Sequence, residues 1–155
     1  MCKNKFKNVW WKNGIRFQCQ GSGNCCCTHG EYNFVYLTPK ERNKLAKHLK
    51  LSLKDFTKKY CQFSDELYHL KSRSSGHCIF FNKKSKRCEI YPLRPFQCRT
   101  GPFWPETLVS KKVWKADVES ICPGINKGKL FTSKKISSLL KEHDKWEDQL
   151  AETEK

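Results

Sequence analysis

Ten cysteines in a chain of 155 residues are the feature that most limits what this sequence can fold into. Hydrophobic residues make up 37% of the chain and aromatic residues 13%, so its core is thin in aliphatic side chains and relies on Trp, Phe and Tyr. Small domains with a thin core commonly gain stability from disulfides or from bound metal. We therefore expect the cysteines to cross-link this fold.

The start of the chain bears on the compartment in which these cysteines fold. A secretory signal has a basic beginning followed by about 7–15 apolar residues. Here Lys or Asn stands at almost every other position from Lys3 to Asn8, and no apolar run of about 18 residues, enough for a membrane span, occurs later. We expect a cytoplasmic protein with no membrane partner, whose thiols ligate metal or carry out redox chemistry.

The first group of cysteines lies in residues 17–27, a polar segment that contains Gly21 and Gly23. Glycine permits the positive φ angles with which a backbone wraps closely round an ion. Adjacent cysteines on an extended backbone point to opposite sides, so the run of three at residues 25–27 is not expected to ligate a single ion. It suits a two-sided or bridged site, with Cys19, Cys25 and Cys26 as candidate ligands.

The second group is Cys78, Cys88 and Cys98, with nine residues between neighbours, followed by Cys122. Residues 78–81 and 88–91 flank the basic turn 82–87, and this pattern predicts a β-hairpin in which a cysteine opens each strand. Pro92 and Pro95 are expected to stop regular structure after the hairpin, and this proline-bent segment can bring Cys98 back to it. The candidate metal ligands of both groups are Cys19, Cys25, Cys26, Cys78, Cys88, Cys98 and Cys122.

Thiolate ligands alone do not distinguish zinc from iron, and an iron–sulfur cluster stays open as a third form. We interpret Cys2 as a free thiol and Cys61 as a buried one. The roles of Cys27, His29 and His77 are left open, and Arg94 and Arg99 are candidate donors to sulfur.

Three stretches resemble the YkgJ family of cysteine-cluster proteins, a CxxCxxCC zinc- or iron-chelating domain. These are Cys19-x5-Cys25-Cys26, residues 37–41, and the compound motif from Cys78 through Cys88-Glu89-Ile90-Tyr91-Pro92-Leu93-Arg94-Pro95-Phe96-Gln97-Cys98-Arg99 to Phe103. The resemblance implies a cysteine-rich metal site in a bacterial-type cytosolic protein, with no settled activity for most members; some related domains sit in a flagellin lysine methylase. Ser22 stands at the second cysteine of the pattern, so its full set requires Cys27 or Cys61 as a substitute.

Local signals predict the helices and strands. A hydroxyl precedes each of two helices, in Thr38-Pro39-Lys40-Glu41 and in Ser52-Leu53-Lys54-Asp55, and residues 32–37 suit a strand. Thr132 or Ser133 caps a last helix, whose core-facing stripe is Ile136, Leu139, Leu140, His143, Trp146 and Leu150. The expected fold is small α+β, an irregular metal-stabilised cysteine-rich domain with a helix pair, a β-hairpin and a C-terminal helix. Residues 1–14 form a basic arm, 15–128 the metal-binding domain, and 129–155 a helix packed on it.

Charge and motifs leave three functions open. The leading one is a metal-binding protein with a structural or redox-active metal. The second is a metalloenzyme acting on protein or peptide side chains, which needs an open coordination position. The third is a nucleic-acid or ribosome-associated protein, because the formal net charge of +16 predicts weak, salt-dependent attraction to polyanions. The oligomeric state is left open.

Overall fold

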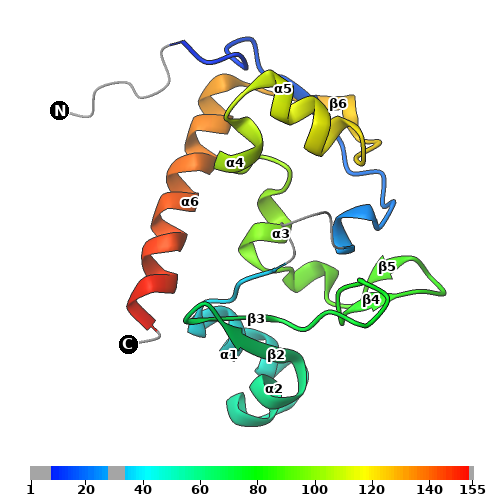
Figure 1. Cartoon of the computed structure of the whole chain (residues 1–155), viewed down its shortest axis with the longest axis vertical. Coiled ribbons are helices and arrows are strands. Elements are labelled where there is room, and N and C mark those ends of the chain that lie inside the picture. The colour runs from blue at the N-terminus through cyan, green and yellow to red at the C-terminus, as the bar shows by residue number, and fades with distance from the viewer. Residues whose placement is uncertain (1–7, 28–33, 154–155) are drawn as a thin grey trace. The chain divides into compact units, whose positions relative to one another are not determined.

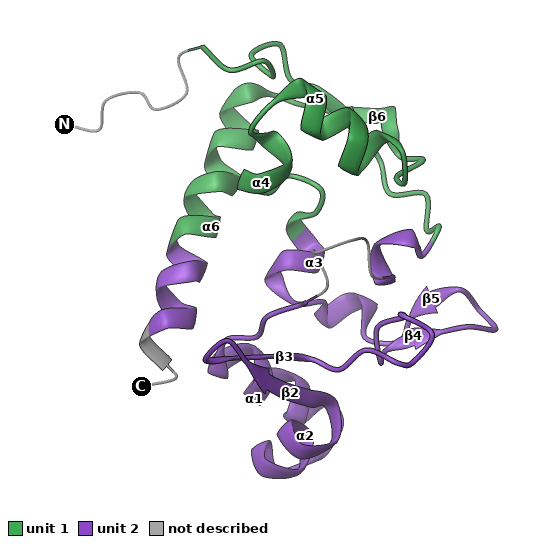
Figure 2. Cartoon of the chain, in the orientation of Figure 1, with its two compact units in different colours: residues 1–22, 100–144 green, residues 23–99, 145–155 purple. Residues whose placement is uncertain are grey.

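The computed structural model describes residues 8–27 and 34–153, with the side chains of the last two omitted. The chain divides into two compact units, shown in Figure 2. Unit 1 comprises residues 1–22 and 100–144, and unit 2 comprises residues 23–99 and 145–155. Helix α6, Ser133–Thr153, contributes residues to both. The fold is small α+β, as the sequence predicts (Figure 1).

Unit 1 is built on an antiparallel pair of strands that lie far apart in the sequence. Strand β1, Ile15–Phe17, pairs with β6, Ile125–Phe131, and the register shifts between Arg16 and Phe17. The short helices α4, Pro105–Leu108, and α5, Lys111–Trp114, lead into a π-helical turn, Lys115–Glu119. Together with the first part of α6 they bury one apolar core: Trp11, Ile15, Phe103, Leu108, Trp114, Val118, Ile125, Ile136, Leu139 and Leu140.

The predicted helix pair is confirmed in unit 2. Helix α1, Pro39–His48, begins at a capping box in which the Thr38 hydroxyl accepts from the Glu41 backbone N–H and the Glu41 carboxylate accepts from the Thr38 N–H. Helix α2, Leu53–Tyr60, is capped by Ser52. Both helices contribute to a second apolar core, formed by Leu37, Leu45, Ala46, Phe56, Cys61, Leu70, Phe80 and Ile90.

Two hairpins complete unit 2. Strand β2, Cys61–Ser64, pairs with β3, Leu67–Leu70, through a two-residue turn in which both residues have positive φ. Strand β4, Phe81–Asn82, pairs with β5, Arg87–Cys88, so the predicted hairpin is present. It is shorter than predicted, and the prediction that a cysteine opens each strand is wrong. Cys78 precedes β4, in an isolated bridge with Ser72, and Cys88 is the last residue of β5, where it pairs with Phe81.

Two predictions for the backbone of unit 2 need correction. In residues 34–37, the described part of the predicted strand 32–37, Tyr36 forms only an isolated bridge with His69, and its own N–H donates to the Gln97 side chain at 2.7 Å. Regular structure also continues past Pro92 and Pro95, as a 3-10 turn, Tyr91–Leu93, and helix α3, Phe96–Thr100.

The C-terminal helix agrees with its predicted cap and stripe. The Thr132 hydroxyl accepts from the Lys135 N–H at 3.2 Å, and all six residues of the predicted stripe are buried. Within the described parts of the chain, we find no helix with both the length and the apolar character that crossing a membrane requires.

Candidate metal centre

Five thiols of unit 2 lie close enough to alter one another's ionisation. They are carried by a 3-10 turn, Asn24–Cys26, by the β4–β5 hairpin and the turn before it, and by α3. The five are Cys25, Cys26, Cys78, Cys88 and Cys98. The structure therefore joins two cysteines of the first sequence group with three of the second.

Gly23 shapes the turn that carries Cys25 and Cys26. Its φ of +74° belongs to the left-handed region, and an added Cβ would lie 2.6 Å from the Phe81 ring and 3.3 Å from the Lys86 carbonyl oxygen. The Cys26 N–H donates to the Gly23 carbonyl at 3.0 Å, and the Cys78 N–H donates to the Cys26 carbonyl at 2.7 Å. The absence of a side chain at Gly23 thus lets the first cysteines lie against the hairpin.

Cys78 and Cys88 have the same kind of surroundings, in which burial and a backbone N–H act on the thiol in opposite directions. Burial raises the pKa of both thiols, whereas the backbone N–H two residues later, of Phe80 and of Ile90 respectively, donates to the sulfur and lowers that pKa. Neutral thiols are weak acceptors, so backbone donors directed at sulfur favour the thiolate. Two of the five sulfurs are therefore prepared to carry negative charge.

Cys98 lies on α3, and both burial and neighbouring thiols affect its ionisation. Burial raises the pKa of its thiol, and the charges of Cys78, Cys25 and Cys88 raise it further, whereas Arg94 lowers it. The Arg94 guanidinium stacks on the Tyr91 ring at 3.8 Å and its Nε donates to the Tyr91 carbonyl at 3.0 Å. Arg94 also lowers the pKa of Cys88, so it offsets thiolate charge at two ligand candidates.

The surroundings of Cys26 oppose the ionisation of its thiol more clearly than those of the other thiols. A hydrogen bond with the Cys25 thiol, then burial, then the charges of Cys25, Cys88 and Cys78 all raise the pKa of Cys26. Several thiolates cannot ionise together in a partly buried site unless a cation compensates them. The donor set fits a soft divalent metal ion, since bound metal stabilises the thiolate form of each ligand.

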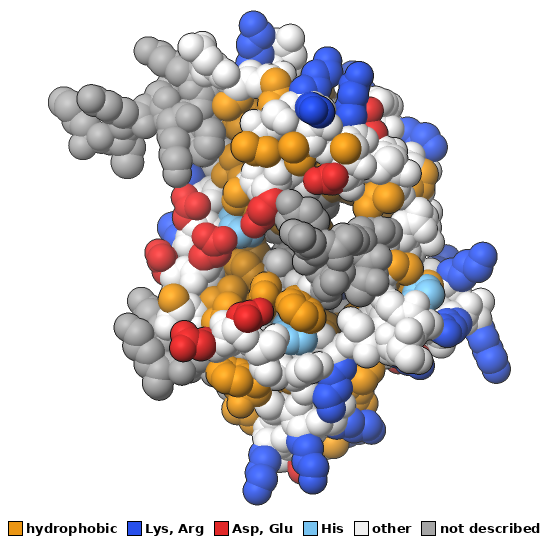
Figure 3. Space-filling view, in the orientation of Figure 1, with side chains coloured by type: hydrophobic (Ala, Val, Ile, Leu, Met, Phe, Trp, Pro, Cys, Tyr) orange, Lys and Arg blue, Asp and Glu red, His pale blue; other side chains and the backbone are white. Residues whose placement is uncertain are grey.

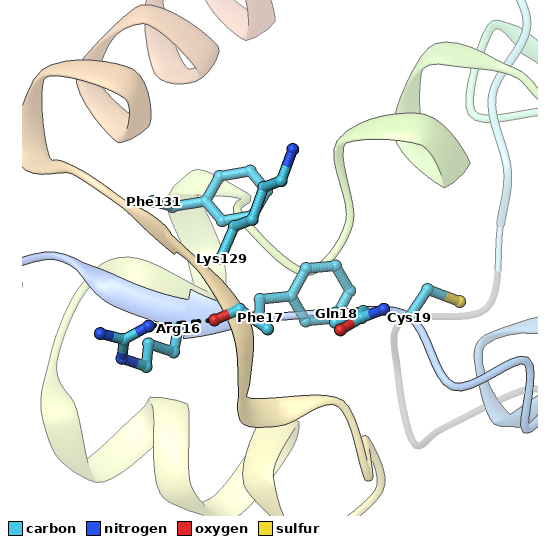
Figure 4. Close-up of a pocket in the computed structure, with 7 residues that line it drawn as sticks. Arg16, Phe17, Gln18, Cys19, Lys129 and Phe131 are labelled. Carbon is cyan, nitrogen blue, oxygen red and sulfur yellow. Dashed lines mark hydrogen bonds between the residues drawn. The ribbon is translucent and has the colours of Figure 1, made fainter.

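The other two candidate ligands, Cys19 and Cys122, belong to unit 1. Cys19 is exposed at a hollow of about 610 Å³, also lined by Arg16, Phe17, Gln18, Gly128, Lys129 and Phe131 (Figure 4). The Cys122 N–H donates to the Val118 carbonyl at 2.8 Å, and its side chain packs on the unit 1 core. Their ligation stays a prediction.

The remaining thiols and histidines differ in their surroundings. Cys61 is buried in the unit 2 core, as predicted, and burial raises its pKa to about 11. The Cys27 thiol donates weakly to the Gly23 carbonyl at 3.8 Å. His77 stacks on Phe81 with 4.8 Å between ring centroids, and its Nδ1 lies 3.1 Å from the Ser75 hydroxyl. Cys2 and His29 lie outside the described residues.

Sequence reasoning missed four features of this centre, and three of them involve the backbone. These are the helix under Cys98, the N–H donors of Phe80 and Ile90, and the connection from Glu41 to Phe96 over 2.7 Å. The Glu41 capping role was readable from the sequence, but its contact with residue 96 was not, because the two are far apart along the chain. Arg73 also lowers the pKa of Cys78, and nothing in its sequence context indicates this role.

Basic side chains gather at the end of the β4–β5 hairpin. Lys83, Lys84 and Lys86 of the turn and Arg87, the first residue of β5, are all exposed. Lys and Arg side chains project from this region in the space-filling view (Figure 3).

Comparison with known proteins agrees with the chemistry of the cluster. A family model described as "CxxCxxCC: Putative zinc- or iron-chelating domain" matches residues 18–123. An uncharacterized protein of Methanocaldococcus jannaschii is 33% identical over 103 residues, which cover 66% of this chain and 53% of that protein. The chain therefore spans about half the length of this curated relative. No solved structure matches.

Proposed function

Because this chain belongs to the CxxCxxCC family of zinc- or iron-chelating domains, we propose that it binds zinc or iron through cysteine thiolates, in a structural or redox-active role. The proposed ligands are Cys25, Cys26, Cys78, Cys88 and Cys98, together with Cys19 and Cys122. The observation that carries the proposal is the electrostatic interaction among the five thiols of unit 2. When bound, the metal supplies the positive charge that these thiolates need.

The number of thiolates limits the possible metal content. A tetrahedral zinc ion takes four thiolates, and iron–sulfur clusters are also held by about four cysteines. Five thiolates suit one such centre with a spare or bridging sulfur, whereas seven require a second ion or a larger cluster. An iron–sulfur cluster is one form in which iron could occupy these thiolates.

Elemental analysis of the full chain, purified without oxygen, tests the function. We expect close to one or two equivalents of zinc or iron per chain, and the visible spectrum separates them, since an iron–sulfur protein is brown and a zinc protein is colourless. A folded, metal-free preparation that takes up neither metal would refute the proposal.

Cys88→Ser tests the ligand set. Serine is close to cysteine in size but is a poor ligand for soft metals, so the variant should lose metal and become protease-sensitive together. Cys61→Ser is the matched control, because Cys61 is buried in the unit 2 core and its pKa is shifted by burial, Arg42 and Lys71 rather than by another thiol. It should lose about 1–3 kcal/mol of stability while keeping its metal. Full metal occupancy in Cys88→Ser would remove this residue from the ligand set.

A double variant, Cys19→Ser with Cys122→Ser, tests the two candidates of unit 1. If both are ligands, metal content falls toward the amount that five thiolates hold. Unchanged metal content and affinity would restrict the ligand set to unit 2.

A second, weaker interaction is proposed for the basic turn of the hairpin. Its four exposed cations, Lys83, Lys84, Lys86 and Arg87, support electrostatic binding of a polyanion such as nucleic acid.

A further inference from the structure

The Glu41 carboxylate accepts hydrogen bonds from three separate parts of unit 2. Oε2 accepts from the Thr38 backbone N–H at 2.9 Å, from the Thr38 hydroxyl at 3.0 Å and from the Trp146 indole N–H at 3.1 Å. Oε1 accepts from the Phe96 backbone N–H at 2.7 Å. Three of these donors share Oε2 and the fourth is directed at Oε1, so both oxygens of the Glu41 carboxylate are engaged.

The bond to Phe96 connects Glu41 to a candidate metal ligand. Phe96 is the first residue of α3, and Cys98 follows two residues later on this short helix. The next residue, Gln97, is held as well, because its side-chain carbonyl accepts from the Tyr36 N–H at 2.7 Å. Two hydrogen bonds from distant parts of the sequence therefore anchor the residues directly before Cys98.

Trp146 adds α6 to the same arrangement. Its ring stacks on Phe96 with 5.4 Å between centroids and 24° between planes, and it is only 6% exposed. The same residue that donates to Glu41 thus packs on the residue that Glu41 holds. The end of α6 is thereby linked to α3 within unit 2.

We propose that Glu41 is a positioning residue of the metal centre, which holds α3 so that Cys98 presents its sulfur to the metal. This inference rests on the proposed function. A ligand held in place by outer hydrogen bonds binds metal more tightly, because less conformational freedom is lost on binding. Glu41 acts through the Phe96 N–H rather than by touching the metal.

The side chain at position 41 must offer two acceptor oxygens, because all four groups directed at it are hydrogen-bond donors. In Glu41→Gln one acceptor oxygen becomes an NH₂ group, which repels an N–H donor at the same place. Asp55 of α2 is the control, because it stands three residues after the capping residue Ser52, as Glu41 does after Thr38, and its Oδ2 accepts from the Ser52 hydroxyl at 2.7 Å. Asp55→Asn therefore changes an acidic side chain at the start of a helix without altering the bond from Glu41 to α3.

Zinc affinity, measured on the full chain by competition with a chromophoric chelator, tests the proposal. We expect Glu41→Gln to bind zinc about 10- to 100-fold more weakly than the parent, and Asp55→Asn to match the parent. Trp146→Phe, which keeps the stacking but loses the indole N–H, should weaken binding in the same direction by a smaller factor. If Glu41→Gln does not fold, the zinc affinity of Trp146→Phe tests the positioning role instead. Parent-like affinity in the folded variants would overturn the positioning role.

Cobalt(II) in place of zinc separates positioning from a general loss of stability. Its sulfur-to-metal charge-transfer band grows with the number of bound thiolates. The cobalt-loaded Glu41→Gln protein should show a weaker band than the parent, shifted toward that of Cys98→Ser. An unchanged band in the loaded protein would mean that Glu41 serves only the fold. If the parent itself binds neither zinc nor cobalt, the proposed function fails rather than the role of Glu41.

Discussion

At the scale of single residues, the same side chain serves two purposes according to its surroundings. Cys61 is 5% exposed in an apolar core, where burial outweighs the favourable charges of Arg42 and Lys71 and raises the pKa of its thiol. Burial also raises the pKa of Cys26 and Cys98, but there neighbouring thiols raise the pKa as well. A cluster of thiols that hinder one another's ionisation indicates a metal site, whereas a single buried thiol indicates packing.

The ionisation of Cys61 should make the protein less stable in alkali. Its pKa is about 11 in the folded chain against 9.0 for an ordinary cysteine, so the unfolded chain loses this proton first as the pH rises. The free energy of unfolding should therefore fall between about pH 9 and pH 11, by roughly 3 kcal/mol at most. Urea unfolding of the metal-loaded protein at several pH values measures this dependence.

The control for this pH dependence is Cys61→Ala, which cannot ionise. It should start from a lower stability, because a small cavity replaces the sulfur, and then lose less stability than the parent above pH 9. Parallel curves for the two proteins would show that Cys61 does not carry the effect.

At the scale of elements, the turn that carries Cys25 and Cys26 depends on close approach to the hairpin. Gly21 and Gly23 both have positive φ, at +65° and +74°. Only Gly23 has neighbours within reach of a Cβ, whereas nothing lies within 4 Å of the corresponding position at Gly21. The two glycines therefore separate backbone strain from packing.

Gly23→Ala should lower metal affinity as well as stability. The new Cβ would meet the Phe81 ring and the Lys86 carbonyl, so the turn must move away from the hairpin that carries Cys88. Gly21→Ala should lose only the strain of a left-handed residue, on the order of 1 kcal/mol, with zinc affinity close to the parent. Equal zinc affinities in the two variants would contradict this account of the turn.

At the scale of the whole molecule, the two units have separate cores but unequal shares of the proposed centre. The ten residues of the unit 1 core include no cysteine, whereas the five interacting thiols all belong to unit 2. Metal-binding energy is folding energy for the part of the chain that supplies the ligands. Unit 2 should therefore depend on metal more than unit 1 does.

Removing the metal with a chelator should increase hydrogen exchange first in residues 34–99. The β1–β6 pair and the first half of α6 should keep more of their protection, because their core contains none of the five thiols. Hydrogen-exchange mass spectrometry of the loaded and the chelated protein measures both regions at once. A uniform loss of protection over the two units would show that the metal stabilises the chain as a single cooperative body.

The net charge of +16 belongs to the same scale and predicts salt-dependent association with polyanions. Binding of single-stranded RNA should weaken steeply between about 50 and 200 mM salt, since it depends on counterion release. Lys84→Glu with Lys86→Glu should weaken it further without changing metal content. Lys44→Glu with Lys47→Glu, on exposed positions of α1, is the charge-matched control. Binding that persists unchanged at high salt would exclude an electrostatic origin.

The sequence by itself determined the features that depend on neighbouring residues. The caps at Thr38, Ser52 and Thr132 and the apolar stripe of α6 were predicted correctly, because capping bonds and helical periodicity connect positions about three or four residues apart. The β4–β5 hairpin was also predictable, since a short basic turn joins its strands.

Only the tertiary structure decided which distant segments meet. It placed Cys25 near Cys98 and Cys26 near Cys78 and Cys88, paired Phe17 with Ile125, and brought Glu41 to the start of α3. Such contacts depend on how whole elements bury their apolar faces together, and no spacing along the chain records that outcome. For this reason the cysteine motif identified the chemistry, whereas the fold decided which thiols lie together.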